Sequence, residues 1–325
     1  MFGEGGLPQS SSFGSCSLKL FSINDLLNKS FRVFKIKTFN FNMPLFHRVT
    51  ILGPGLLGAS LCMAVKEREI AEKVRVWARK ESVLAKCKQE KWCDEIEPNL
   101  TQAVKESDLV VVCTPVNNIE GMLAEVIGET TANSIITDVG SVKETICRIG
   151  HREAQTRQST FIGSHPMAGS EKSGLEYAHS DLFDQRTCMI TPFKDDPVSD
   201  SLKLENFWTE LGMKVQQKSP EEHDMIVASV SHLPHLIAST LSEYLSHRPE
   251  SWLQMSGQGL KDTSRIAEGD PYLWREIMKS NRHFLTQALD SWSDSVTIFK
   301  KMLDEENWDG IEDFLARAKE CRKKM

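Results

Sequence analysis

A glycine-rich turn near the start of the regular part of the chain constrains the fold more than any other feature. It reads Gly53-Pro-Gly55-Leu-Leu-Gly58. The β-branched run 49–52 precedes it directly, and the apolar-periodic segment 56–66 follows it directly. A strand, a G-x-G-x-x-G turn and a helix in this order are typical of a dinucleotide-binding βα unit, although the glycine pattern alone is a weak signal. The pattern therefore predicts a parallel α/β domain with a nucleotide site at this turn.

Each glycine of the turn has its own physical task. Gly53 permits the tight turn, Gly55 lets the backbone approach a pyrophosphate, and Gly58 lets helix and strand pack closely. Leu56 and Leu57 lie at the helix N-terminus, where free N–H groups and the positive dipole end attract an anion. A P-loop is excluded because alanine, not lysine, follows the last glycine. The predicted ligand is NAD or NADP, and the alternative is a tight turn without a ligand.

The end of the second predicted strand bears on the choice of cofactor. NAD-binding proteins place an acidic residue there to bind the ribose 2′-hydroxyl. Ala78 occupies that place in this chain, and Arg79 and Lys80 follow it. A cationic pair can accommodate a 2′-phosphate. We therefore favour NADP over NAD, with ordinary solvated charges at a strand end as the alternative.

Strand and helix patterns alternate through the first two thirds of the chain. Such spacing predicts βαβ units and a mostly parallel sheet, that is, a Rossmann-type α/β domain. After residue 220 only long helical patterns remain, so we expect an all-helical domain there. The predicted strands cover residues 49–52, 74–77, 109–113, 134–139, 160–163, 187–191 and 214–217. The predicted helices cover residues 56–66, 82–89, 118–127, 221–246, 249–266, 271–301 and 308–324.

These patterns divide the chain into three parts. Residues 1–46 form an N-terminal extension without clear periodicity, which we expect to be poorly ordered, or to reflect an over-extended start site before Met43. Residues 47–218 form the dinucleotide-binding domain, and residues 219–325 form the helical domain. A length of 325 residues fits about two domains.

Composition excludes several classes of protein. A net charge of −6 disfavours nucleic-acid binding, which needs a basic surface. No run of about 18 apolar residues is present, so a membrane-spanning helix is not expected. The eight cysteines form no C-x-x-C pair and indicate reduced thiols, consistent with a cytoplasmic protein. No ligand spacing predicts a metal site.

A second group of motifs follows later strands. The segment 163–174 reads GSHPMAGSEKSG and places His165 in a loop beyond a strand, where open α/β sheets bind ligands. The segment 138–143 reads DVGSVK, and the segment 231–235 in the first long helix reads SHLPH. Together with the glycine turn, these residues resemble the prephenate/arogenate dehydrogenase family of tyrosine biosynthesis. The resemblance runs from Arg48 to about residue 300.

The resemblance implies a reaction and an assembly. Members of that family oxidatively decarboxylate prephenate to 4-hydroxyphenylpyruvate, or arogenate to tyrosine, with hydride transfer to NAD(P)+. They are homodimers joined through the helical domain. His165 matches the catalytic histidine that takes the proton of the ring hydroxyl, and Ser141 matches the serine that orients it. Thr114 and Pro115 match the loop that lies along the cofactor.

The resemblance also implies a substrate site built largely from the helical domain. Arg265 matches the arginine that grips a substrate carboxylate. A guanidinium suits that task because it forks onto a carboxylate in two hydrogen bonds. Without the resemblance, a helix-surface ion pair of Arg265 with Asp262 is the plainer interpretation. The other matched substrate-binding residues are Glu171, Asp262, His232, His235 and Trp274.

Two further functions stay open at this point. One is a β-hydroxyacid dehydrogenase or imine reductase, which would need a catalytic lysine in the helical domain. The other is a non-catalytic NAD(P)-binding sensor. A Ser–His hydrolase is disfavoured because no G-x-S-x-G turn exists.

The remaining histidines are predicted to be surface or capping residues. They are His47, His151, His179, His223, His247 and His283.

Overall fold

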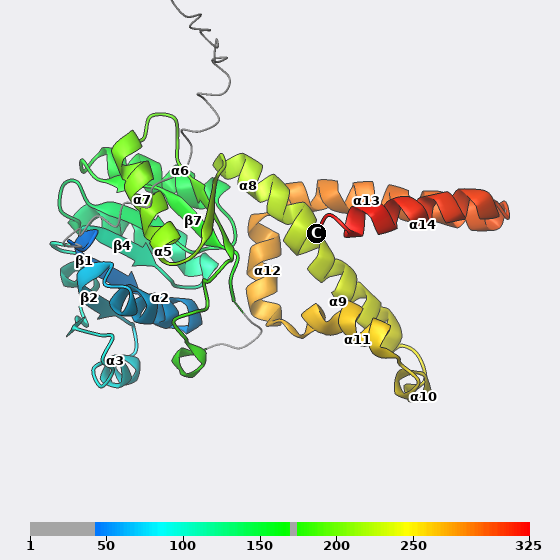
Figure 1. Ribbon diagram of the computed structural model, residues 1–325, viewed down its shortest axis with the longest axis horizontal. Helices are drawn as coiled ribbons and strands as arrows, with labels where there is room; N and C mark the ends of the chain where they lie inside the picture. Colours follow the sequence, from blue (N-terminus) through cyan, green and yellow to red (C-terminus); the bar gives the residue numbers. More distant parts are fainter. Residues whose placement is uncertain (1–42, 170–173) are drawn as a thin grey trace, which may run out of the picture. The chain divides into compact units, whose positions relative to one another are not determined.

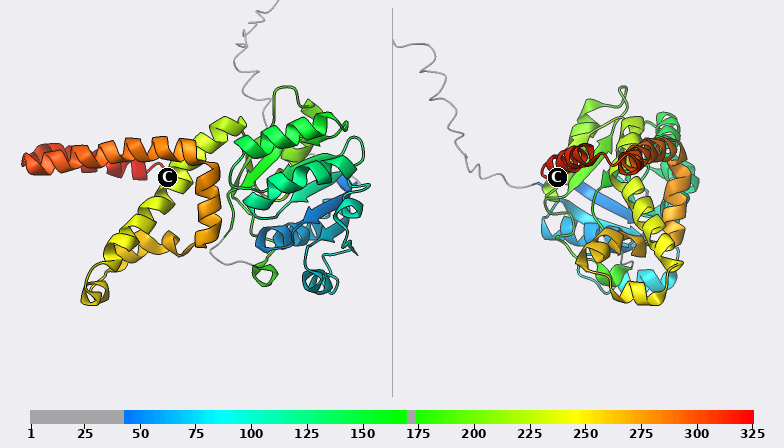
Figure 2. Two further views of the ribbon diagram at one scale, coloured as in Figure 1. Left: turned by 180° about the vertical axis from the view of Figure 1, so that it is seen from behind. Right: turned by 90° about the vertical axis from the view of Figure 1, so that its right-hand side faces the viewer.

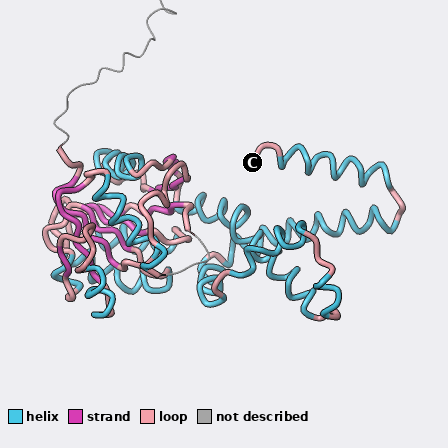
Figure 3. Tube along the Cα trace, turned by 60° about the horizontal axis from the view of Figure 1, so that its bottom comes forward, coloured by secondary structure: helices cyan, strands magenta, loops and turns pink. Residues whose placement is uncertain are grey.

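A computed structural model describes residues 43–169 and 174–325. The expectation for the N-terminal extension therefore lies almost wholly outside the described residues, as does Glu171. Residues Pro44–Met325 belong to one structural unit. Within it, the described strands all lie before residue 218, and the described chain beyond is helical (Figure 3).

The main sheet has six parallel strands in the order β3-β2-β1-β4-β5-β6 (Figure 1). This is the strand order of the doubly wound dinucleotide-binding fold, so the predicted fold class is confirmed. The order reverses between β1 and β4, where such sheets bind ligands outside their carboxyl ends. The strands are β1 (Phe46–Leu52), β2 (Ala71–Trp77), β3 (Glu95–Ile96), β4 (Leu109–Val112), β5 (Ile135–Asp138) and β6 (Thr160–Phe161).

Helices cover both faces of this sheet (Figure 2). Leu109 and Val111 of β4 join one buried cluster with α2 and α7, whereas Val110 and Val112 join a second cluster with α5 and α6. A strand buried on both faces is a continuous apolar run, as expected for a parallel sheet. The helices are α2 (Leu56–Glu67), α3 (Glu81–Cys87), α4 (Leu100–Ala103), α5 (Val116–Glu129), α6 (Glu144–Gln155) and α7 (Val198–Glu210), with a short 3₁₀ turn at Leu175–Tyr177.

A second sheet of three strands stands beside the first: β7 (Gly163–Pro166), β8 (Thr187–Thr191) and β9 (Lys214–Gln217). The sequence predicted a single strand over 160–163, but the chain leaves the main sheet there and enters the second one. Close packing explains the glycine at this point, because a Cβ on Gly163 would lie 2.5 Å from the sulfur of Cys147. Strand β7 is antiparallel to β8 and carries His165.

The helical part contains more breaks than predicted. The helix expected over 249–266 is divided into α10, α11 and a 3₁₀ turn, and the one expected over 271–301 is divided at Asn281. The side chain of Asn281 donates to the carbonyl of Asp224, so a tertiary contact stabilises this break. Helices α13 and α14 pack side by side (Figures 1 and 2). The elements are α8 (Pro220–Val227), η2 (Ala228–His232), α9 (Leu233–Ser246), α10 (Glu250–Gln254), α11 (Gln258–Ser264), η3 (Arg265–Glu268), α12 (Pro271–Ser280), α13 (Arg282–Asp304) and α14 (Trp308–Arg322).

Helices α8 and α9 form one continuous helical segment with a π-helical stretch, η2, between them. Pro234 explains the stretch, because it lacks the N–H that an α-helix would donate to Val230. By length and composition, the segment Pro220–Ser246 is apolar enough to cross a membrane, contrary to the sequence expectation. Its buried His223 and Asp224 form hydrogen bonds to residues of the sheet-containing part. We therefore interpret its N-terminal part as a helix packed against the sheet-containing part, while only about a third of the apolar segment is buried in the single chain.

Candidate active site

The glycine turn has the geometry that the sequence predicts. Gly53 has a φ of +98°, which non-glycine residues rarely adopt. A Cβ on Gly58 would lie 2.2 Å from the Gly53 carbonyl oxygen, so this position needs glycine for close packing. A Cβ on Gly55 would meet nothing within 4 Å, so open space lies beside that backbone. The turn therefore offers an approachable backbone at the N-terminus of α2, which no side chain caps.

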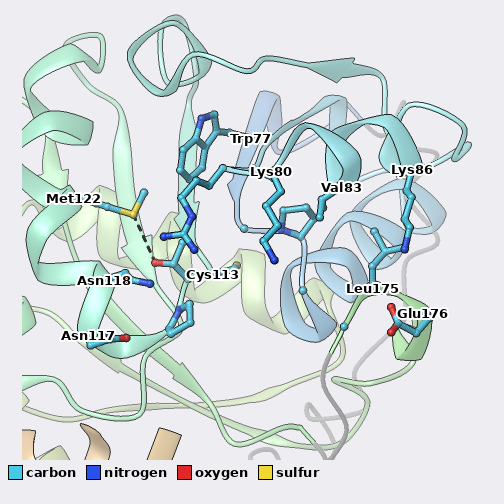
Figure 4. Close-up of a pocket in the computed structure, with 18 of the residues that line it drawn as sticks. Trp77, Lys80, Val83, Lys86, Cys113, Asn117, Asn118, Met122, Leu175 and Glu176 are labelled. Atoms are coloured by element: carbon cyan, nitrogen blue, oxygen red, sulfur yellow. Dashed lines mark hydrogen bonds between the residues drawn. The ribbon is translucent and has the colours of Figure 1, made fainter. Parts of the chain in front are cut away.

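A cavity of about 740 Å³ opens at this turn, at the carboxyl ends of β1, β2 and β4. Figure 4 shows Lys80 and Lys86 on one side of it and Asn117 and Asn118 on the other. Thr114 donates from Oγ1 to the sulfur of Met122 across 3.7 Å. Of the predicted cofactor residues, Leu56, Leu57 and Gly58 are not among the lining residues, whereas those that line the cavity are Gly53, Gly55, Arg79, Lys80, Thr114 and Pro115.

Alanine at Gly55 or at Gly58 is expected to act in different ways. Gly55→Ala has room for its Cβ and should unfold like the unchanged protein, while the KM for the dinucleotide rises about 10-fold, equivalent to about 1.4 kcal/mol. Gly58→Ala must displace the turn and should lose about 1–3 kcal/mol of unfolding free energy. Denaturant unfolding and cofactor titration measure the two effects. Unchanged cofactor affinity in Gly55→Ala would contradict a pyrophosphate site at this turn.

His165 lies within strand β7 rather than in the predicted loop beyond a strand, and the residue is 8% exposed. Its Nδ1 is 2.8 Å from Nε2 of His223, a residue of α8. Its Nε2 has no hydrogen-bond partner among the described residues. Burial holds the pKa of His165 well below its usual value, and the nearby His223 and Lys143 add to this effect. The ring is therefore neutral at pH 7, as a general base must be before it takes a proton.

His223 is the main residue that the sequence analysis misplaced. It was expected at the surface or as a helix cap, but it is fully buried. Its Nδ1 is 2.7 Å from the Asp224 carboxylate, and burial lowers its pKa to about 2. The prediction was wrong because α8 packs with His223 facing strand β7. There it contacts His165, which lies 58 positions earlier in the chain. A histidine next to an aspartate, four residues after the N-cap Ser219, was the available signal.

A buried ion pair lies beside the two histidines. Lys143 and Asp138 are both fully buried, and the Lys143 ammonium donates to the Asp138 carboxylate. Gly140 also donates its N–H to that carboxylate across 2.8 Å. A buried pair with further hydrogen bonds holds a backbone segment in a defined geometry, whereas a single unpaired charge would be costly. The motif DVGSVK thus forms a turn from β5 to α6 that this ion pair and hydrogen bond hold in place; we call it the braced turn.

Ser141 lies half-buried in that braced turn. Among the described residues, no hydrogen bond joins Ser141 to His165, whose Nδ1 partner is His223. The orienting role of Ser141 stays a prediction. Glu171 lies outside the described residues, so its role also stays a prediction.

His232, His235 and Trp274, which the resemblance assigns to the substrate site, lie together in the structure. The rings of His235 and Trp274 stack with centroids 3.6 Å apart, and the ring of His232 meets the indole edge-on at 6.2 Å. His232 is 1% exposed and receives the Asn281 amide at its Nδ1 across 3.1 Å. Nε2 of His232 and Nδ1 of His235 lack partners among the described residues. These buried polar atoms are suited to bind a polar ligand, since unpaired ones are costly.

Arg265 and Asp262 line a separate cavity of about 560 Å³ in the helical part, together with Ser242 and Lys261. Both are exposed, and no ion pair joins them in the part of the chain that the structure describes; Asp262 receives the Gln258 amide instead. Ile266, the residue after Arg265, hydrogen-bonds to His235 through its backbone.

Among the described residues, no group of three or more potential metal ligands is found.

Comparisons with known proteins give consistent results. The family model of the prephenate dehydrogenase nucleotide-binding domain matches residues 61–217, and that of the prephenate dehydrogenase dimerization domain matches residues 219–317. A cyclohexadienyl dehydrogenase of Zymomonas mobilis is 29% identical over 76% of this chain and 85% of its own. A prephenate dehydrogenase of Bacillus subtilis is 27% identical over 84% of this chain and 75% of its own.

Solved structures agree with these matches. Prephenate dehydrogenase from A. aeolicus in complex with hydroxyphenyl propionate and NAD+ superimposes with a TM-score of 0.80, at 27% identity. The superposition covers 88% of this chain and 99% of that one. A hydroxyisobutyrate dehydrogenase from Mycobacterium tuberculosis reaches a TM-score of only 0.50 at 14% identity, which shows a shared fold alone.

Proposed function

Because the chain belongs to the prephenate dehydrogenase family, we propose that it oxidatively decarboxylates prephenate or arogenate with NAD(P)+ in tyrosine biosynthesis. The supporting observation is His165, a buried neutral imidazole with one nitrogen unpartnered among the described residues. In this proposal residues 47–218 bind the dinucleotide, and residues 219–325 contribute the substrate site and the dimer contact. A cytoplasmic location would fit such a biosynthetic step.

His165 acts as the general base. The substrate is a cyclohexadienyl ring with a 4-hydroxyl and a quaternary carbon that bears a carboxylate. As the carbinol carbon loses its hydride, Nε2 of His165 takes the hydroxyl proton. Loss of CO₂ then makes the ring aromatic, which drives the reaction forward. When bound, the dinucleotide supplies the hydride acceptor. The open backbone at Gly55 and the cavity around it fit this group.

The helical part holds the substrate's charged and polar groups. Arg265 binds a carboxylate through its fork of N–H donors. The unpartnered ring nitrogens of His232 and His235 offer further polar contacts from one helical segment. Trp274 holds His235 in place by stacking. The proposed substrate-binding groups are thus all side chains of this protein. The reaction needs no metal ion, because the dinucleotide accepts the hydride.

We favour NADP as the preferred cofactor. Among its described lining residues, the cavity at the glycine turn has the cations Arg79, Lys80 and Lys86 and one acidic residue, Glu176. The acidic residue that would bind a ribose 2′-hydroxyl is replaced by the small, buried Ala78. The excess of positive charge supports binding of a 2′-phosphate.

Removing the two cations that follow β2 is expected to change the preference. Arg79→Ala with Lys80→Ala should lower kcat/KM for NADP+ about 10- to 100-fold, because each charge-assisted hydrogen bond contributes about 1.5–3 kcal/mol. The value for NAD+ should change little. Lys88→Ala, at the exposed end of α3, is the matched control. If the unchanged protein uses NAD+ better than NADP+, the preference proposed here is wrong.

An absorbance assay at 340 nm with the purified protein tests the function itself. Prephenate and arogenate are each supplied with NAD+ and with NADP+, and reduction of the dinucleotide is followed. We expect turnover with at least one pair. No turnover with any pair, while the dinucleotide binds, would instead favour the sensor or the hydroxyacid dehydrogenase alternative.

We further infer a homodimer through the helical part. The matching family model for residues 219–317 describes a dimerization domain. Large apolar side chains are exposed there in the single chain, including Met225, Trp252 and Trp292. Exposed apolar surface of this kind marks an interaction site. Light scattering should give twice the chain mass of 36.7 kDa, and a monomeric mass at micromolar concentration would contradict the inference.

A further inference from the structure

We propose that Asp224 and His223 act as positioning residues that hold His165 in a single tautomer, with its proton on Nδ1 and its lone pair on Nε2. This inference rests on the proposed function for its catalytic meaning. The geometry behind it is a chain of hydrogen bonds from the N-terminus of α6, through α8, to β7.

The chain starts at a carboxylate that only accepts. Oδ1 of Asp224 receives the backbone N–H of Lys143 at 2.7 Å, and Oδ2 receives that of Glu144 at 2.9 Å. Both backbone donors are fixed, since an amide N–H cannot change its direction. Burial raises the pKa of Asp224, but these two N–H groups and the Lys143 charge oppose the shift. Such a surrounding of hydrogen-bond donors stabilises the ionised carboxylate.

The first ring then has only one compatible protonation. Nδ1 of His223 lies 2.7 Å from Oδ1 of Asp224, so it must carry the proton and donate it. The ring is neutral, because burial lowers its pKa to about 2. In a neutral imidazole one nitrogen donates and the other accepts. Nε2 of His223 is therefore an acceptor.

The second ring is determined by the first. Nδ1 of His165 lies 2.8 Å from that acceptor, so it must donate. Nε2 of His165 is left with a lone pair and, among the described residues, with no partner. The opposite tautomer would place two lone pairs against each other in a buried site, which costs about 1–3 kcal/mol. The carboxylate of Asp224 thus determines which nitrogen of His165 is basic, through one hydrogen bond to His223 and a second from His223 to His165.

This arrangement also serves the protonated state. When Nε2 takes up a proton, the His165 ring becomes a cation with N–H groups on both nitrogens. Its Nδ1–H keeps its acceptor on His223, whose own N–H points at the ionised Asp224. The positive charge therefore develops along a line of preorganised dipoles that ends in a negative charge. Such preorganisation stabilises the transition state without reorganisation at the moment of reaction.

Two substitutions of His223 test whether His165 needs the hydrogen-bond acceptor at this position or only a side chain of similar size. His223→Gln retains a side-chain oxygen near the position of Nε2, so it can still accept from His165. His223→Met has a similar length but no comparable acceptor. We expect His223→Gln to keep kcat within about 10-fold, and His223→Met to lose about 100-fold in kcat, with KM changed less than about 3-fold in both. His47→Gln, an exposed histidine at the start of β1, is the control.

Nitrogen NMR of the full chain with ¹⁵N-labelled histidine gives a readout that does not depend on turnover. The signals of residues 165 and 223 are assigned by their loss in His165→Asn and His223→Gln. We expect both rings to be neutral with the proton on Nδ1, and His223→Met to move residue 165 toward Nε2–H. Protonation of residue 165 on Nε2 in the unchanged protein would overturn the proposal, even if His223→Met fails to fold.

Equal kcat values for folded Gln and Met variants would also overturn it. A lack of turnover by the unchanged protein with every substrate and cofactor would count against the proposed function instead, because the NMR result would still report the tautomer. The two proposals therefore fail through different measurements.

Discussion

Replacement of His165 by asparagine is expected to lower kcat by about 10²–10⁴-fold, which is the usual value of a positioned general base. Asparagine can still receive or donate hydrogen bonds, but it cannot take the hydroxyl proton. The substrate remains bound through the helical part, so KM should change little. Stopped-flow measurement of dinucleotide reduction gives the rate of the hydride step directly.

The pH dependence provides a second measurement on the same residue. Burial lowers the pKa of His165, and a lower pKa means that the neutral base persists to lower pH. The acid limb of the kcat/KM profile should therefore lie below pH 6.5, the ordinary histidine value. A limb at or above pH 6.5 in the unchanged protein would contradict a desolvated His165. Near-normal kcat in His165→Asn would mean that another group is the base.

Replacement of Arg265 by alanine is expected to raise KM about 100-fold or more, with a milder effect on kcat. A guanidinium that forks onto a carboxylate makes two charge-assisted hydrogen bonds, each contributing about 1.5–3 kcal/mol. Arg265 is exposed, lines a cavity, and has no ion-pair partner among the described residues, so its donors are available to a ligand. Steady-state kinetics with varied substrate at saturating dinucleotide measure the effect.

Two variants show whether charge or fork geometry matters. Arg265→Lys keeps the charge but loses the planar pair of donors, so it should recover only part of the loss. Arg248→Ala removes another arginine of the helical part, which lies over the ring of Tyr244, and it should leave KM unchanged. An unchanged KM in Arg265→Ala would remove this residue from the substrate site.

Local patterns in the sequence carried much of the fold and part of the site. The glycine turn, the apolar runs of β1 and β4, and the change to helices near residue 220 were all predictable. Short-range chemistry explains this success. Gly53 needs a positive φ, Gly58 sits against a carbonyl oxygen, and a buried parallel strand must be apolar on both faces. Strand β3 and helix α4 were missed because two and four residues are too few to show a period. Helices α6 and α7 were also missed, although each buries residues at helical spacing.

The site divides in the same way. Motif and resemblance predicted site roles for His165, His232, His235 and Trp274, and the rings of the last three lie together in the structure. His223 was wrongly predicted to lie at the surface or in a helix cap. Asp138 and Lys143 were quoted in the DVGSVK motif without a role, and Asp224 was not singled out. Their burial depends on which face of α8 meets the turn after β5, about 80 residues away along the chain. The local periodicity of the sequence does not show which face of α8 makes this contact.

The sequence alone determined that this chain builds a dinucleotide turn on a parallel sheet and follows it with helices. Backbone sterics and side-chain periodicity act over a few residues, so they are visible in a string of letters. Only the tertiary structure decided which nitrogen of His165 is paired with His223 and which is left without a partner among the described residues. This pairing depends on hydrogen bonds among β7, α8 and the start of α6, and those bonds exist only after long-range packing has excluded water and brought the three elements together.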